Sequence, residues 1–169
     1  MEFTALPLIA EVGAALAGFA TLSGVIRGDV LDSDALFDAV LNSLIAVFFS
    51  LLALLFGSLG ADGLGLRIVA VALLLTSALS LTRSLRVTRA AASNETLEFD
   101  RVSRIIGYLT LLSMLAVPPL ALTVAAGLFP AHAALLFESA VFGNLVAGIL
   151  ALLYVVWRNL AIPLAPPPA

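Results

Sequence analysis

Long runs of apolar residues, separated by short polar segments, set the pattern of this chain. The runs cover residues 5–26, 35–59, 65–82, 105–127 and 134–157. A helix needs about 20 mostly apolar residues to cross a hydrocarbon core roughly 30 Å thick, so each run is long enough to span a membrane. Lipid cannot satisfy open backbone groups, and the alternation typical of a membrane barrel is missing. The pattern predicts an all-α polytopic transmembrane bundle of five spanning helices, forming one domain over residues 1–169.

The basic residues give this bundle a direction. With five spans, every arginine except Arg67 falls on the same side of the membrane: Arg27, Arg83, Arg86, Arg89, Arg101, Arg104 and Arg158. Segments on the cytoplasmic side carry an excess of basic residues. We therefore expect the amino end outside, the carboxyl end in the cytoplasm and an Arg-rich cytoplasmic loop over 83–104.

Composition narrows the class of protein. Hydrophobic residues make up 62% of the chain and charged residues 11%, both far from the values of a soluble domain. The absence of Cys excludes disulfides and thiolate metal sites, and the absence of Lys excludes Schiff-base chemistry. We expect no enzyme activity, cofactor, metal or nucleic-acid partner. The lipid bilayer is the expected partner, in a bacterial cytoplasmic (inner) membrane.

Small residues recur at intervals of three and four in several runs, which lets helices approach closely in lipid. The stripes comprise Ala10, Ala14, Ala17 and Gly18 in the first run, and Ala39, Ser43, Ala46, Ser50, Ala53 and Gly57 in the second. Such a stripe packs helices of one chain together or packs one subunit against another. Five short helices with so many stripes favour a homo-oligomer.

Ionisable residues gather at the predicted outer end. Glu11 lies about two turns into the first helix, and an intramembrane carboxylate is a functional candidate because its insertion is costly. Glu138, Arg67 and His132 are expected near the same level. They form a proton or cation entrance, or a structural network in which Arg67 pairs with a carboxylate.

Other polar features lie deeper. The amides of Asn42 and Asn144 serve an ion pathway or bond across helices. Pro118 and Pro119 remove backbone donors from the fourth helix, which makes a hinge or a repaired kink.

Two charged motifs have plain explanations. Arg83, Arg86 and Arg89 follow the every-third spacing of a voltage sensor, but they run into a hydrophilic segment, so we expect them to bind anionic lipid headgroups. The acidic loop at 29–34 lacks the spacing of an EF-hand calcium loop, and helix capping by Ser33 or Asp34 is favoured over a calcium site.

The sequence is compatible with two functions. The first is a small homo-oligomeric membrane protein that forms a cation- or proton-conducting path, with Glu11 as the selectivity or protonation group and Glu138, Arg67 and His132 at the outer mouth. The alternative is a non-catalytic accessory or assembly subunit of a larger membrane complex, in which Glu11 pairs with a basic residue of another membrane subunit.

Overall fold

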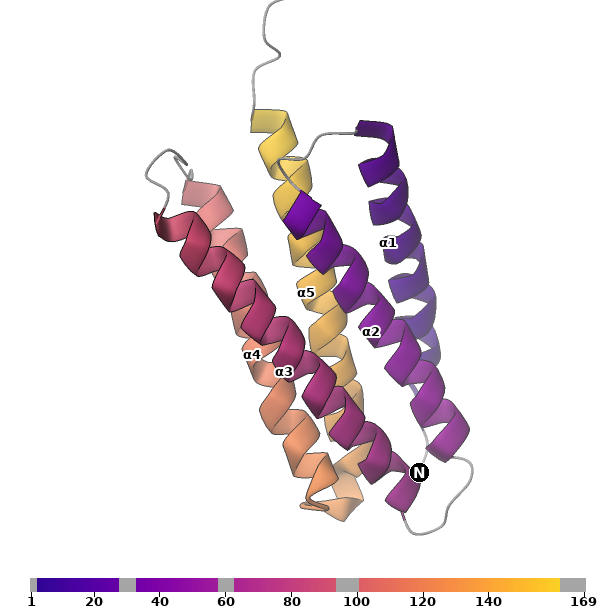
Figure 1. The fold of residues 1–169 in the computed structure, drawn as a ribbon. Coiled ribbons are helices and arrows are strands. Elements are labelled where there is room, and N and C mark those ends of the chain that lie inside the picture. Colours follow the sequence, from indigo (N-terminus) through magenta and orange to yellow (C-terminus); the bar gives the residue numbers. More distant parts are fainter. Residues whose placement is uncertain (1–2, 28–32, 58–62, 94–100, 162–169) are drawn as a thin grey trace, which may run out of the picture.

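The computed structural model describes residues 3–27, 33–57, 63–93 and 101–161, and these residues are almost entirely helical. The helices run in alternating directions along one bundle (Figure 1). Their bounds are α1 Leu6–Arg27, α2 Ser33–Gly57, α3 Leu64–Ser93, α4 Arg101–Ala125 and α5 Ala133–Ala161, with the short 3-10 helix η2 Pro130–His132 before α5. The prediction of an all-helical bundle is confirmed.

The predicted apolar runs correspond to the observed helices, with one large difference in length. α3 does not end near residue 82 but continues to Ser93, through the first part of the predicted cytoplasmic loop. Hydropathy marks where a helix is apolar, whereas a helix ends only where its backbone finds other partners. Arginine and alanine are good helix formers, so α3 continues beyond its apolar part.

Within the described residues, four helices are long and apolar enough to cross a membrane: α2, α3, α4 and α5, the last together with η2. The described apolar part of α1, Leu6–Leu22, is shorter. These lengths and compositions are those of an integral membrane protein. Large apolar side chains such as Leu79 and Phe48 are exposed on the outside of the bundle, as a lipid-facing surface requires.

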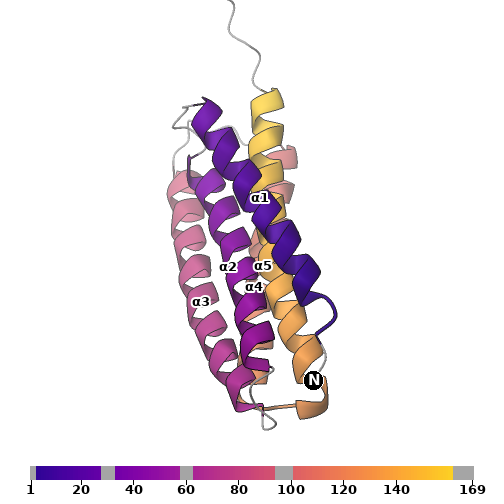
Figure 2. The same ribbon diagram turned by 90° about the vertical axis from the view of Figure 1, so that its right-hand side faces the viewer.

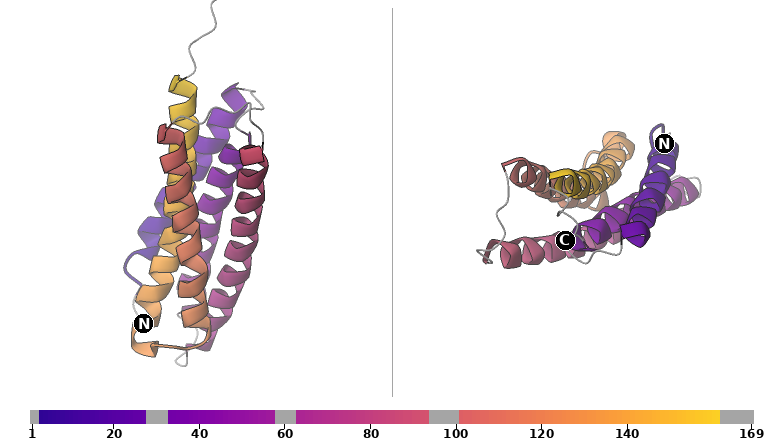
Figure 3. Two further views of the ribbon diagram at one scale, coloured as in Figure 1. Left: turned by 90° about the vertical axis from the view of Figure 1, so that its left-hand side faces the viewer. Right: turned by 90° about the horizontal axis from the view of Figure 1, so that it is seen from above.

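The helices α2 to α5 form a closed ring in which each contacts the next, and α5 returns to α2. Figure 2 and Figure 3 show this arrangement from the sides and from above. α1 lies outside the ring, against α2 and, over a smaller area, against α5. The buried centre of the bundle draws on several helices, with Leu73 from α3, Val117 from α4 and Phe137 from α5.

Three helices approach one another closely at one turn of α2 around Ser43. A Cβ added to Gly148 of α5 would lie 2.7 Å from Ser43 Oγ, and one added to Gly13 of α1 would lie 3.1 Å from the Ser43 carbonyl oxygen. A Cβ at either glycine would therefore crowd a backbone carbonyl oxygen of α2. The small-residue packing predicted from the sequence is therefore used within the chain at this crossing.

The two predicted stripes differ in their surroundings. In α2 the described members are all buried: Ala39, Ser43, Ala46, Ser50 and Ala53. In α1, Ala10 and Ala17 are buried, whereas Ala14 and Gly18 are exposed. A Cβ on Gly18 would meet nothing within 4 Å. The surroundings of Gly57 lie outside the described residues. The α2 stripe therefore packs the chain itself, and half of the α1 stripe is left on the surface.

α4 passes through Pro118 and Pro119 as one continuous helix. It ends in a left-handed turn at Gly127, where the Gly127 amide bonds the Val124 carbonyl and the Leu128 amide bonds the Thr123 carbonyl. This pair of hydrogen bonds is the Schellman arrangement, which satisfies the last carbonyls of a helix. It brings the chain directly into η2 and α5.

Candidate polar site in the helix bundle

An ion cluster joins α2 and α3 at the end of the bundle where α3 ends and α2 begins, called here the Arg-rich end. Arg83 donates to Asp38 Oδ1 at 2.7 Å and to Asp34 Oδ1 at 3.0 Å. Ser84 donates to the other carboxylate oxygen of Asp38 at 3.1 Å. The Asp38 side chain is only 15% exposed, against 64% for Asp34, so Asp38 is the inner member of the cluster.

Arg83 is also held by an aromatic ring. Its guanidinium carbon lies 4.0 Å from the centroid of the Phe37 ring, within the range of a cation–π interaction. The sequence predicts that Arg83 binds lipid headgroups together with Arg86 and Arg89, whereas its guanidinium donates to Asp38 and Asp34 of α2. Arg86 is exposed, and the side chain of Arg89 lies outside the described residues.

Below this cluster, two buried asparagines connect three helices. Asn42 donates to the Asp38 carbonyl at 2.7 Å and accepts a hydrogen bond from Ser80 of α3 at 3.4 Å. Asn144 of α5 donates to Ser77 of α3 at 3.4 Å. Both asparagines are almost completely buried. α3 is thus bonded to α2 through Ser80 and to α5 through Ser77, about one helical turn away.

Two serines on the inner side of α2 differ from the other hydroxyls of the bundle. Ser43 Oγ and Ser50 Oγ are buried, and no described residue is their hydrogen-bond partner. Seven described hydroxyls bond the carbonyl one turn back in their own helix: Thr21, Thr76, Thr82, Thr110, Ser113, Thr123 and Ser139. A buried polar group without a partner costs about 1–3 kcal/mol, so both serines call for an explanation.

Glu138 has a defined partner at the opposite end of the bundle. It is 8% exposed, and its Oε1 accepts a hydrogen bond from the backbone amide of Ala5 at 2.9 Å. Ala5 precedes the first residue of α1, where backbone amides lack partners within the helix. A carboxylate at this position also favours the positive end of the helix dipole. Glu138 therefore caps α1 from α5.

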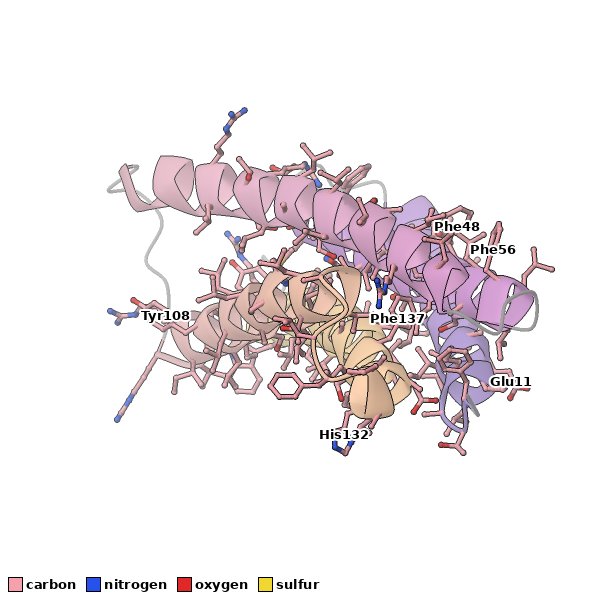
Figure 4. All side chains as sticks on the ribbon, turned by 90° about the horizontal axis from the view of Figure 1, so that it is seen from below. Glu11, Phe48, Phe56, Tyr108, His132 and Phe137 are labelled. Atoms are coloured by element: carbon pink, nitrogen blue, oxygen red, sulfur yellow. The ribbon has the colours of Figure 1, made fainter. Side chains whose placement is uncertain are left out.

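The other ionisable residues predicted for this end do not join Glu138. Glu11 and His132 are exposed, and they lie on separate parts of the end that Figure 4 shows from below. Arg67 is also exposed, and its Nη2 would lie 2.5 Å from a Cβ on Gly127, beside the carboxyl end of α4. A cation there is favoured by the helix dipole. Among the described residues, neither Glu11 nor Arg67 forms an ion pair.

The described residues contain no group of three or more His, Cys, Asp or Glu side chains that could hold a metal ion. Of the acidic loop at 29–34, Asp29 and Asp32 lie outside the described residues, and Asp34 bonds Arg83.

Sequence reasoning missed the pairing of Asp38 with Arg83 and the contacts of Ser77, Ser80 and Ser84. One signal was present in the sequence. Ser77, Ser80 and Ser84 recur at intervals of three and four on α3, which places them on one face of the helix.

Comparison with protein-family models, with curated proteins and with solved structures found no match for this chain.

Proposed function

We propose that this protein is a five-span homo-oligomer of the bacterial inner membrane that provides a path for protons or small cations. The observation that carries the proposal is the position of Glu11, an exposed carboxylate in the apolar part of α1. In a membrane, the outside of the bundle meets lipid or another protein. A carboxylate on that surface is costly in lipid and calls for a protein or water-filled surrounding.

The face around Glu11 supports contact with another copy. Ala14 and Gly18 are exposed on the same helix, and Gly18 has open space above its Cα. Small residues of this kind allow a second helix to approach closely in lipid. In a ring of copies, the Glu11 carboxylates would lie at equivalent positions around an axis, an arrangement that selects cations in pores.

Flux from purified protein in liposomes tests this proposal. Proton and alkali-cation flux is measured for the unmodified chain and for Glu11→Gln, which keeps the shape of the side chain and removes its charge. We expect the substitution to lower the flux by about ten-fold or more, or to change which cation passes. Leu8→Gln is the matched control, since it adds an amide to the exposed side of the same helix and leaves Glu11 in place.

Two results contradict the proposal. Absence of flux from folded protein across pH and voltage would remove the transport function. Equal loss of flux in both variants would show that an added amide, and not the missing carboxylate, blocks the path.

A second function fits the same exposed carboxylate. As an accessory subunit of a larger complex, the protein would use Glu11 to pair with an arginine or lysine of a different membrane protein. Absence of flux, together with capture of one such protein by the unmodified chain and not by Glu11→Gln, would favour this function.

The proposed topology places the Arg-rich end in the cytoplasm. Because the chain has no Cys, single cysteines report topology without background. We expect a membrane-impermeant maleimide to label Ala131→Cys in intact spheroplasts and to label Val102→Cys only after lysis. Both positions are exposed, at opposite ends of the bundle. The reverse labelling pattern would invert the topology.

A further inference from the structure

The buried hydroxyls of Ser43 and Ser50 lie between polar groups that reach from one end of the bundle towards the other. Asp38 and Asn42 precede them on α2. The hydrogen bonds of Ser80 to Asn42 and of Asn144 to Ser77 join this part of the bundle to α3. Other described hydroxyls bond a carbonyl of their own helix or a side chain of a neighbouring helix, whereas these two are buried without either kind of partner.

The antiparallel packing of α2 and α5 sets the register of these groups. Gly148 of α5 lies against Ala39 and Ser43 of α2. Ser50 is about two turns further along α2, which corresponds to about two turns back along α5, near Val141. Glu138 lies about one turn beyond Val141. Along the bundle, Ser50 therefore lies between the level of Asn144 and the level of the buried Glu138 carboxylate.

We propose that water occupies a continuous polar column inside each chain, leading from Asp38 past Asn42, Ser43, Asn144 and Ser50 to Glu138. Buried waters in proteins bond polar groups that would otherwise lack partners, and the two serine hydroxyls are such groups. The column lies between α2, α3 and α5, ends at Glu138 beside the start of α1, and uses none of the exposed residues. It therefore goes beyond the proposed function, which concerns Glu11 on the outside of α1.

Silver ions test whether water reaches the column. Ag⁺ is a small monovalent cation that binds a thiolate as the thiol releases its proton, and a thiol in a dry core does not ionise. Ser50→Cys is a nearly isosteric probe in a chain that has no other cysteine. Ala121→Cys is the matched control, a fully buried position on α4, which contributes no member of the column.

We expect Ag⁺ to consume the thiol of Ser50→Cys about ten-fold or more faster than that of Ala121→Cys. The remaining thiol is counted with a fluorescent maleimide after denaturation. Equal rates, or no reaction at either position, would overturn the proposal. If either variant fails to fold, magnetisation transfer from water to Ser50 in the unmodified protein in lipid decides, with Ala121 as reference. Faster transfer at Ser50 supports the column, and equal transfer overturns it.

This test does not depend on transport. Fast reaction at Ser50→Cys with no ion flux from the unmodified protein would retain the column and reject the proposed function. Slow reaction with flux that depends on Glu11 would reject the column and retain the proposed function.

Discussion

Asp38 shows how a single side chain ties two helices together in an apolar setting. It accepts from Arg83 and Ser84 through different oxygens, and its own backbone carbonyl accepts from Asn42. Removing one member of a shielded pair leaves the other charge uncompensated, which costs more than the loss of an exposed contact. Asp34 binds the same guanidinium, but it is largely exposed.

At this scale we expect Asp38→Asn and Asp34→Asn to differ although both remove a carboxylate from Arg83. Asp38→Asn should lower the free energy of unfolding by about 1–3 kcal/mol, because charge-assisted hydrogen bonds to a shielded side chain are lost. Asp34→Asn should cost about 0–1 kcal/mol, the usual range for an exposed pair. Reversible unfolding in mixed micelles measures both. Equal losses would show that Asp38 is no better shielded than Asp34.

The sequence could not assign Arg83 to Asp38 because the two residues are separated by 45 positions. Spacing within α3 suggested a row of arginines, and lipid headgroups were the nearest plausible partner. Which arginine turns inward depends on the side of α3 that faces α2. By contrast, the burial of Asn42 and Asn144 followed from their places in apolar runs, since a buried amide needs a partner on a neighbouring helix.

At the scale of helices, apolar run lengths were enough to predict every long element. They were not enough to predict which small residues make the closest contacts. The α2 stripe is buried as a packing stripe should be, yet its nearest approaches involve Gly13 and Gly148, which the stripe pattern did not single out. Such contacts depend on the crossing point of two helices, which the sequence of one helix does not contain.

Gly148→Ala tests this crossing. The new methyl would lie 2.7 Å from Ser43 Oγ and 3.2 Å from the Ala39 carbonyl oxygen, so the Ser43 hydroxyl must turn away and the contact between α5 and α2 must loosen. We expect a loss of about 1–3 kcal/mol in unfolding free energy, typical of overpacking. Gly107→Ala is the control, since its methyl would meet nothing within 4 Å. There, the better helix propensity should raise stability by up to about 1 kcal/mol. Equal effects at both glycines would contradict a close α2–α5 contact.

At the scale of the whole molecule, α1 is the helix that lies outside the ring formed by α2 to α5. One side packs on α2 and α5, while the other side carries Glu11, Ala14 and Gly18 on the surface. The four-helix ring does not need that second side. α1 thus has small residues on two sides, and only one side packs within the chain. The other side is suited to pack against a helix of another protein chain.

Gly18→Leu separates folding from assembly. Since nothing lies within 4 Å of a Cβ at Gly18, the leucine should leave the unfolding free energy of the single chain within about 0.5 kcal/mol. It should lower the mass of the complex measured in mild detergent or nanodiscs, because it fills the space a second helix would use. Gly107→Leu, at another open glycine on α4, should leave the mass unchanged. A single-chain mass for the unmodified protein would contradict self-assembly.

The hydrogen bond from Ala5 to Glu138 has a consequence for how the chain is made. Its two residues are separated by 133 positions, so the cap on α1 cannot form before α5 has been synthesised. During synthesis α1 can enter the membrane and pack on α2, but its amino end stays uncapped until α5 has been inserted. The hydrogen bond between Ala5 and Glu138 can therefore form only when all five helices have been synthesised. A nascent chain stopped after α4 would keep an unsatisfied backbone amide at its first helix.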